Sequence, residues 1–352
     1  MQVMQALQWD VFCRVVDNFG DIGVCWRLVA DLAARGQRVR LWVDDAAPLR
    51  WMAPDGAAGV EVQGWPRDTA AFVPGDVVIE AFGCDLPGAL VRRMALAARP
   101  PLWINLEYLS AEDFVERSHR LGSPPTDAAA AGLQKFFFYP GFTPSTGGLI
   151  REPDLASRLR AFDAPAWLAT RSVRVSSSER VVSLFCYEQP ALPALLAQLS
   201  AQPTLLLATA GHAARQVVAA LGPAMRLGDL RALPIELSSQ GEYDHLLWAS
   251  DLNFVRGEDS FVRAQWAGKP FVWHIYPQQD GAHVAKLDAF LARFGASIEV
   301  QGFCHAWNAG GTVLPTLPGP CDWRRQCENW RDRLFAQVDL TSQLLGFAFE
   351  PR

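Results

Sequence analysis

Val16-Asp17-Asn18-Phe19-Gly20-Asp21-Ile22-Gly23 joins an apolar run at residues 11–16 to a helical pattern at residues 22–35. The apolar run is typical of a buried strand, and Gly36 follows the helical pattern where a helix commonly ends. A parallel strand, a tight turn and a helix N-terminus place side chains at the carboxyl edge of a sheet, where open α/β folds bind ligands. The turn therefore predicts an α/β fold with a ligand site at this edge.

Two carboxylates and two glycines give this turn its chemical character. Asp21 has a structural explanation, because an aspartate at the start of a helix commonly caps it. Asp17 has no comparable structural role, and Gly20 and Gly23 allow another group to approach the backbone closely. Asn105-Leu106-Glu107-Tyr108 adds polar groups at the end of another expected strand. We therefore regard this edge of the sheet as a candidate site.

Short apolar runs alternate with helical patterns along the rest of the chain. This alternation predicts doubly wound parallel sheets, and 352 residues suffice for two domains. No G-x-G-x-x-G follows the first strand, so the dinucleotide-binding fingerprint is absent. Strands are expected at 39–43, 60–62, 77–82, 102–106, 136–138, 181–187, 204–208, 252–255 and 271–275. Helices are expected at 87–98, 190–199, 212–221, 243–249, 282–294 and 321–335.

Segment 151–172 carries a loose helical pattern that includes Pro153 and Pro165, and it is expected to be the crossing between the two halves of the chain. We expect a first Rossmann-like domain at 1–160 and a second at 173–335. The final apolar segment, 340–349, is expected to run back to the first domain, so that 336–352 belongs to it.

Composition and charge exclude several classes of protein. Half of the residues are hydrophobic and the net charge is −5, which argues against a broad surface for nucleic acid or an anionic membrane. The seven cysteines lack paired spacing and no histidine pair completes a zinc pattern, which favours reduced thiols. We identify no signal peptide, and no apolar run approaches the roughly 20 residues that span a bilayer. We expect a cytoplasmic protein.

A second polar cluster, Arg256-Gly257-Glu258-Asp259-Ser260, follows the strand expected at 252–255. Gly257 makes the turn, and Ser260 is placed to cap the next helix. A helix N-terminus with a hydroxyl forms a ready site for a diphosphate, to which Arg256 would add a charge-assisted bond. The alternative is structural: Asp259 or Ser260 only caps the helix while Arg256 pairs with Glu258. The spacing favours neither interpretation.

Further polar and aromatic residues lie near the second cluster or at other strand ends. Gln240 begins a loop that leads into a helix, and either its backbone contacts a nucleobase or it is an ordinary surface loop. Phe185 and Tyr187 alternate on one strand and so share a face, where they could stack on a base or reach a phosphate. Aromatic residues on a strand are more often part of the core. The six histidines are scattered, and we interpret His274 and His283 as core or surface groups.

The two clusters together resemble a known family. Val16-Asp17-Asn18-Phe19-Gly20-Asp21-Ile22-Gly23-Val24 and Arg256-Gly257-Glu258-Asp259-Ser260-Phe261-Val262-Arg263-Ala264-Gln265-Trp266 are similar to the signature stretches of the EarP family. Its members are bacterial protein-arginine rhamnosyltransferases that modify elongation factor P. The resemblance covers nearly the whole chain in the same order.

This resemblance implies a GT-B glycosyltransferase architecture, with two Rossmann-like domains facing across a cleft. The C-terminal domain would hold dTDP-β-L-rhamnose, and the N-terminal domain would dock elongation factor P. The enzyme would be inverting and would need neither a metal nor another cofactor. Leu237 stands where an aromatic residue would flank the thymine. The catalytic positions fall on Asp17, Asp21 and Glu258, and the donor-binding positions fall on Phe185, Tyr187, Gln240, Arg256, Asp259 and Ser260.

An arginine acceptor poses a chemical difficulty, since guanidinium stays protonated with a pKa above roughly 12. Asp17 and Asp21 can orient its nitrogens and take a proton during attack, and Asp21 is the favoured base. Two other classes remain open. One is a GT-B enzyme with a small or lipid-linked acceptor, and the other is a non-catalytic nucleotide-sugar-binding adaptor. An epimerase of similar architecture is a third alternative.

Overall fold

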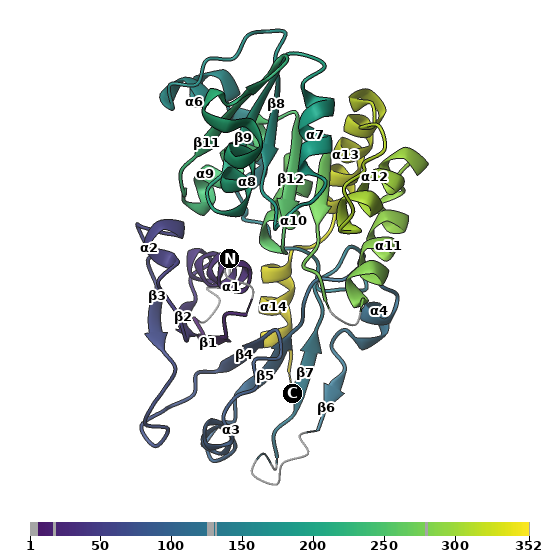
Figure 1. Ribbon diagram of the computed structural model, residues 1–352. Coiled ribbons are helices and arrows are strands. Elements are labelled where there is room, and N and C mark those ends of the chain that lie inside the picture. Colours follow the sequence, from purple (N-terminus) through teal and green to yellow (C-terminus); the bar gives the residue numbers. More distant parts are fainter. Residues whose placement is uncertain (1–5, 17–18, 125–129, 131, 279–280, 352) are drawn as a thin grey trace. The chain divides into compact units, whose positions relative to one another are not determined.

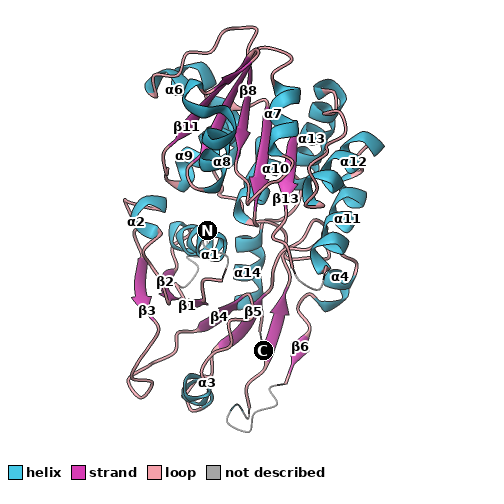
Figure 2. Ribbon diagram, viewed as in Figure 1, coloured by secondary structure: helices cyan, strands magenta, loops and turns pink. Residues whose placement is uncertain are grey.

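The computed structural model describes residues 6–16, 19–124, 130, 132–278 and 281–351. The chain forms two compact units, Met1–Glu152 with Gln337–Arg352, and Pro153–Ala336 (Figure 1). Each unit is built on one mostly parallel sheet with helices packed against it (Figure 2). The expected class, α/β with two Rossmann-like domains, is confirmed. None of the described helices combines the length and the apolar character needed to cross a membrane.

In the first unit, the described strands form a sheet in the order β3-β2-β1-β4-β5-β7-β6. All neighbours pair in parallel except β6 with β7. The strands are β1 (Gln8–Cys13), β2 (Arg38–Val43), β3 (Val60–Gly64), β4 (Val77–Ala81), β5 (Leu102–Leu106), β6 (Gly122–Ser123) and β7 (Lys135–Phe138). The helices are α1 (Gly20–Ala34), α2 (Leu49–Met52), α3 (Gly88–Ala95), α4 (Phe114–Ser118) and α14 (Leu340–Ala348).

The core of this unit lies against both faces of the sheet, and the final helix helps to build it. Ile22 of α1 shares an apolar cluster with Leu344 and Phe347 of α14. Asp10 is a buried charge in β1, and it is paired: Arg40 donates to its two oxygens at 2.6 and 2.7 Å. A buried carboxylate that is hydrogen-bonded in this way is tolerated inside a sheet.

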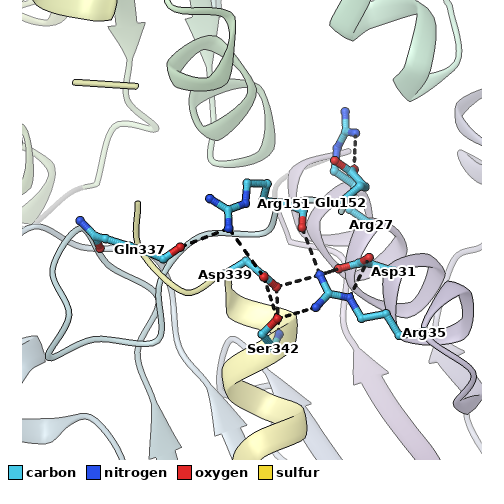
Figure 3. A network of polar contacts seen from close by, with 8 residues as sticks. All are labelled: Arg27, Asp31, Arg35, Arg151, Glu152, Gln337, Asp339 and Ser342. Atoms are coloured by element: carbon cyan, nitrogen blue, oxygen red, sulfur yellow. Dashed lines mark hydrogen bonds and ion pairs between the residues drawn. The ribbon is translucent and has the colours of Figure 1, made fainter. Parts of the chain in front are cut away.

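Arg35 joins α1 to α14 and to the end of segment 1–152 (Figure 3). Its guanidinium donates to Asp31 at 2.8 and 3.1 Å and to Asp339 at 2.8 Å. It also donates to the Ser342 hydroxyl at 2.6 Å and to the Arg151 carbonyl at 3.1 Å. Asp339 is the N-cap of α14 as well. One guanidinium therefore ties three separate parts of the chain together.

In the second unit, the described strands are ordered β10-β11-β9-β8-β12-β13, and only β10 pairs antiparallel. The strands are β8 (Arg180–Leu184), β9 (Thr204–Thr209), β10 (Arg226–Leu227), β11 (Leu230–Ile235), β12 (Leu252–Arg256) and β13 (Phe271–His274). The helices are α5 (Leu155–Ala161), α6 (Ala164–Thr170), α7 (Leu192–Leu199), α8 (His212–Leu221), α9 (Gln240–Ala249), α10 (Asp259–Ala267), α11 (Ala282–Phe294), α12 (Ile298–Asn308) and α13 (Pro320–Phe335), with a 3₁₀ turn at Gly222–Ala224.

Several strands differ from the expectation. The short strands β6 and β10 were not predicted, and β8 ends at Leu184, so Phe185 and Tyr187 follow the strand on which they were expected. β1 ends at Cys13 rather than Val16, whose surface is 70% exposed. β11 was not predicted, because Pro234 interrupts its pattern. Pro234 pairs in register with Ala208 of β9, and it lies beyond Leu230 and Arg231, the part of β11 that β10 covers. Prolines within sheets occur mainly along such uncovered edges.

The strand order reverses beside β1 in the first sheet and beside β8 in the second. β1 lies between β2 and β4, and β8 lies between β9 and β12. At such a switch point the connections leave on opposite faces of the sheet, so ligands bind outside the carboxyl ends of the strands. The β1–α1 turn lies at the first switch point and the β12–α10 turn at the second. Both polar clusters seen in the sequence therefore occupy ligand-binding positions of their sheets.

Candidate functional site

Asp21 lies in the first turn of α1 and only 3% of its surface is exposed. The Val16 backbone N–H donates to its Oδ2 at 2.8 Å, and the Tyr108 hydroxyl donates to its Oδ1 at 3.2 Å. The structural explanation for Asp21 is wrong, because α1 begins at Gly20 and its N-cap is Phe19. The carboxylate instead closes the β1–α1 turn onto Val16 and is held beside Tyr108.

Tyr108, from the loop after β5, belongs to the polar stretch 105–108 expected at this edge, but no catalytic or binding role was predicted for it. Its ring stacks on Phe82, with centroids 4.4 Å apart and planes 15° apart. Phe82 follows β4 with a φ of +59°, a conformation that costs a non-glycine residue about 1–3 kcal/mol. A 2.7 Å bond from its N–H to the Leu106 carbonyl helps to hold it there. The strand ends thus present an aromatic pair next to Asp21, with 39% of Tyr108 exposed.

The other two predicted catalytic residues are placed differently. Asp17 lies outside the described residues. Glu258 belongs to the second unit, where it is half-buried and forms the N-cap of α10 without a capping side-chain bond. Asp259 and Ser260 are the first residues inside that helix. The alternative in which Asp259 or Ser260 caps α10 is therefore wrong.

Arg256 ends β12 and is buried, with 9% of its surface exposed. Its Cζ lies 4.4 Å from the Phe185 ring centroid and 4.6 Å from that of Tyr187, and it donates to the Cys186 carbonyl at 3.3 Å. The alternative pairing with Glu258 is wrong: in the part of the chain that the structure describes, Arg256 has no carboxylate partner. Burying a cation without a counter-charge is costly, so this arrangement is typical of a site for an anion.

The first turn of α10 brings the remaining predicted donor-binding residues to Arg256. Ser260 Oγ accepts from the Arg256 N–H at 3.1 Å and donates to the Arg256 carbonyl. Gln240 Nε2 donates to Asp259 Oδ2 at 3.1 Å. The expected loop at Gln240 is wrong, because Ser239 caps α9 and Gln240 is the first residue of that helix. The loop position Leu237 is 53% exposed.

His274 belongs to this cluster, although its position in the sequence did not indicate so. It ends β13 in register with Arg256, and its ring lies edge-on to Tyr187 with centroids 5.2 Å apart. Burial, together with the positive charge of Arg256, lowers the pKa of His274 to about 4. In the sequence, both Arg256 and His274 stand at the end of an expected strand, which could have indicated that they belong together. Only the strand order reveals that β12 and β13 are neighbours.

The site chemistry that the structure shows consists of carboxylates, aromatic rings, a guanidinium, an imidazole and a helix N-terminus. Within the described ranges, no three His, Cys, Asp or Glu side chains are grouped so as to hold a metal ion. All seven cysteines carry free thiols, and only Cys321 is exposed.

Comparisons with known proteins agree with this chemistry. Residues 9–349 match the model of a family described as Elongation-Factor P (EF-P) rhamnosyltransferase EarP. The chain is 45% identical to the protein-arginine rhamnosyltransferase of Pseudomonas aeruginosa strain PAO1, over 96% of this chain and 98% of that protein. A solved structure concerned with EarP-mediated arginine glycosylation of translation elongation factor EF-P has a TM-score of 0.65 and 32% identity, covering 97% of this chain and 98% of that one. CalG4, the calicheamicin glycosyltransferase, shares the fold, with a TM-score of 0.54 and 14% identity over 98% of each chain.

Proposed function

This chain belongs to the family of elongation factor P rhamnosyltransferases called EarP, and we propose that it moves rhamnose from dTDP-β-L-rhamnose to an arginine of elongation factor P with inversion. It is a glycosyltransferase with the GT-B fold, whose domains here are the two α/β units. Because the proposed acceptor is a translation factor, we expect the reaction to take place in the cytoplasm.

The observation that best supports a nucleotide-sugar donor is the buried Arg256 guanidinium, which has no carboxylate partner among the described residues. A diphosphate would supply the missing counter-charge and would also meet the N-terminus of α10, a helix of 9 residues. Phe185 and Tyr187, which flank the guanidinium, offer apolar faces beside it. The same groups would stabilise the charge that grows on the departing diphosphate.

The acceptor chemistry is proposed to depend on Asp21. A guanidinium nitrogen forms a bond to the anomeric carbon while the bond from that carbon to the diphosphate oxygen breaks. The electron pair leaves with the diphosphate, and Asp21 takes the proton that the nitrogen loses. The bonds from Val16 and Tyr108 hold the carboxylate in one orientation before the acceptor arrives, so its base function needs little reorganisation. Asp17 is proposed to orient the guanidinium, and Glu258 to position the sugar or the acceptor.

Intact-mass analysis of elongation factor P, incubated with this protein and dTDP-β-L-rhamnose, tests the proposal directly. We expect a deoxyhexose increment on one arginine, located by fragmentation. Donor binding without any increment would support a nucleotide-sugar-binding adaptor instead. Transfer only to a small or lipid-linked acceptor would replace the protein acceptor, and a converted free nucleotide sugar would indicate an epimerase.

A further inference from the structure

His274 has an unusual environment for a histidine that serves only packing. It is 8% exposed, and among the described residues its Nδ1 has no hydrogen-bond partner. Its ring packs edge-on against Trp307 of α12, with centroids 5.9 Å apart, and against Tyr187, with centroids 5.2 Å apart. Leaving a buried ring nitrogen without a partner is destabilising, so a ligand atom that bonds to it would be stabilised at this position.

The identity of that ligand atom follows from the neighbouring charge. Arg256 and His274 are register partners on adjacent parallel strands, so their side chains leave the same face of the sheet side by side. A guanidinium only donates hydrogen bonds, and a protonated imidazole does the same. The acceptor that both groups can share is an anion with several oxygens, such as a diphosphate.

We propose that His274 is a proton-linked contact for the donor diphosphate: it is neutral in the empty site, takes up one proton when the nucleotide sugar binds, and shares the diphosphate oxygens with Arg256. This inference rests on the proposed donor and assigns a residue to it. In the empty site, burial and the positive charge of Arg256 disfavour the imidazolium form of His274. The negative charge of a bound diphosphate would favour that form instead.

The groups that surround His274 would not obscure such a titration. Arg256 and Tyr187 are its charged and phenolic neighbours, and Tyr276 packs edge-on to Tyr187 at 5.5 Å. Burial raises the pKa of the Cys186 thiol, next to Tyr187, to about 12. Burial also raises the pKa of Cys304, on α12, to about 12. Glu258 and Asp259, the carboxylates of the β12–α10 turn, are present in every variant compared. Any proton that they bind therefore contributes equally to each measurement.

Proton uptake on binding fixes the direction in which donor affinity changes with pH. A group whose pKa rises on binding strengthens binding below its bound pKa, and the gain is lost as pH rises through that value. If the diphosphate only restores the ordinary histidine pKa of about 6.5, affinity for the donor rises about fourfold from pH 8 to pH 6. At pH 6, the complex then takes up about 0.75 proton per site.

Isothermal titration of the enzyme with dTDP-β-L-rhamnose, without acceptor, measures both quantities. This ligand is preferred to free dTDP because its diphosphate has no terminal ionisation near neutral pH. Titrations at pH 6 in MES and in Bis-Tris, which differ in ionisation enthalpy, give the number of protons bound. His274→Gln keeps a polar side chain without the titration, and His305→Gln, whose side chain on α12 is 43% exposed, is the control. Circular dichroism checks that both variants fold.

We expect proton uptake in the wild type and in His305→Gln, and no uptake with a flat pH profile in His274→Gln. Wild-type binding without proton uptake, as when a water molecule is the partner of Nδ1, would overturn the inference while leaving the donor intact. Uptake that persists in His274→Gln would assign it to another group and overturn the inference as well. Absence of binding at every pH would instead remove the proposed donor. If His274→Gln does not fold, His274→Asn is measured in its place.

Discussion

The hydroxyl of Tyr108 donates a hydrogen bond to Oδ1 of Asp21 at 3.2 Å, although the two residues are 87 positions apart in the chain. The bond connects the end of β5 to the first turn of α1, over the switch point of the first sheet. It makes Tyr108 a positioning residue for the proposed base, with the Phe82 ring holding the tyrosine from its other side.

Tyr108→Phe removes this hydrogen bond and keeps the stacked ring. Because a bond to a charged group is worth about 1.5–3 kcal/mol, we expect kcat to fall by about tenfold or more. Donor affinity should not change, since the donor-binding residues belong to the other unit. Single-turnover transfer and donor titration measure the two effects separately. Tyr139→Phe, whose hydroxyl makes no hydrogen bond among the described residues, is the matched control. Equal loss in both variants would contradict a specific role for Tyr108.

Asp21→Asn should lose turnover by roughly 10²-fold or more, because the amide cannot accept the guanidinium proton. The geometry is expected to survive: the amide oxygen can accept from the Val16 N–H, and the amide nitrogen can donate to the Tyr108 hydroxyl. Transfer measured by intact mass, with thermal unfolding as the control for structure, tests this prediction. A folded variant with the wild-type rate would remove Asp21 as the base.

Arg256→Ala should weaken dTDP-β-L-rhamnose binding by about 10- to 100-fold, the range of a charge-assisted bond of about 1.5–3 kcal/mol. The fold should persist, because among the described residues no carboxylate is left without its partner. Calorimetric titration measures the affinity. Arg215→Ala, at an exposed position of the same unit, should bind the donor normally. Unchanged affinity in Arg256→Ala would argue against the diphosphate role.

Arg35→Met should destabilise the protein through Asp31, whose side chain is 1% exposed. Burial raises the pKa of Asp31 and the Arg35 bond opposes the rise, so removing Arg35 raises that pKa further. Such a carboxyl destabilises the fold above its unfolded pKa of about 3.9, and the penalty falls as pH approaches that value. We expect a loss of roughly 2–4 kcal/mol at pH 7 and a smaller loss at pH 5.

Urea unfolding at the two pH values measures the effect of Arg35→Met. Arg38→Met, at the exposed start of β2, is the control and should change stability little. A pH-independent loss would show that the guanidinium acts through its contacts to Asp339, Ser342 and the Arg151 carbonyl, rather than through Asp31.

Activity is expected to survive excess EDTA, because Arg256 and the α10 N-terminus are proposed to stabilise the leaving diphosphate. The measurement is rhamnose transfer in EDTA compared with transfer after adding back magnesium or manganese. Complete loss in EDTA, restored by either ion, would overturn this prediction and would make Asp17 and Asp21 candidate ligands.

The sequence by itself determined most of the secondary structure and the composition of the two clusters. Helical periodicity placed the helix at 282–294, which the structure shows as α11. The strand–turn–helix patterns at Asp21 and Arg256 indicated two ligand-binding edges, because such patterns are set by residues within a few positions of one another.

Only the tertiary structure decided the partners of these residues. Strand order and register bring Tyr108 to Asp21 and His274 to Arg256, and the return of the last helix brings Asp339 to Arg35. Local pattern also left a capping role and a site role for Ser260 equally open, and only the structure shows that its hydroxyl bonds to the Arg256 backbone. The physical reason is the same in each case. Spacing along the chain encodes which residues share a face of one element, whereas contacts between elements depend on how whole sheets bury their surfaces.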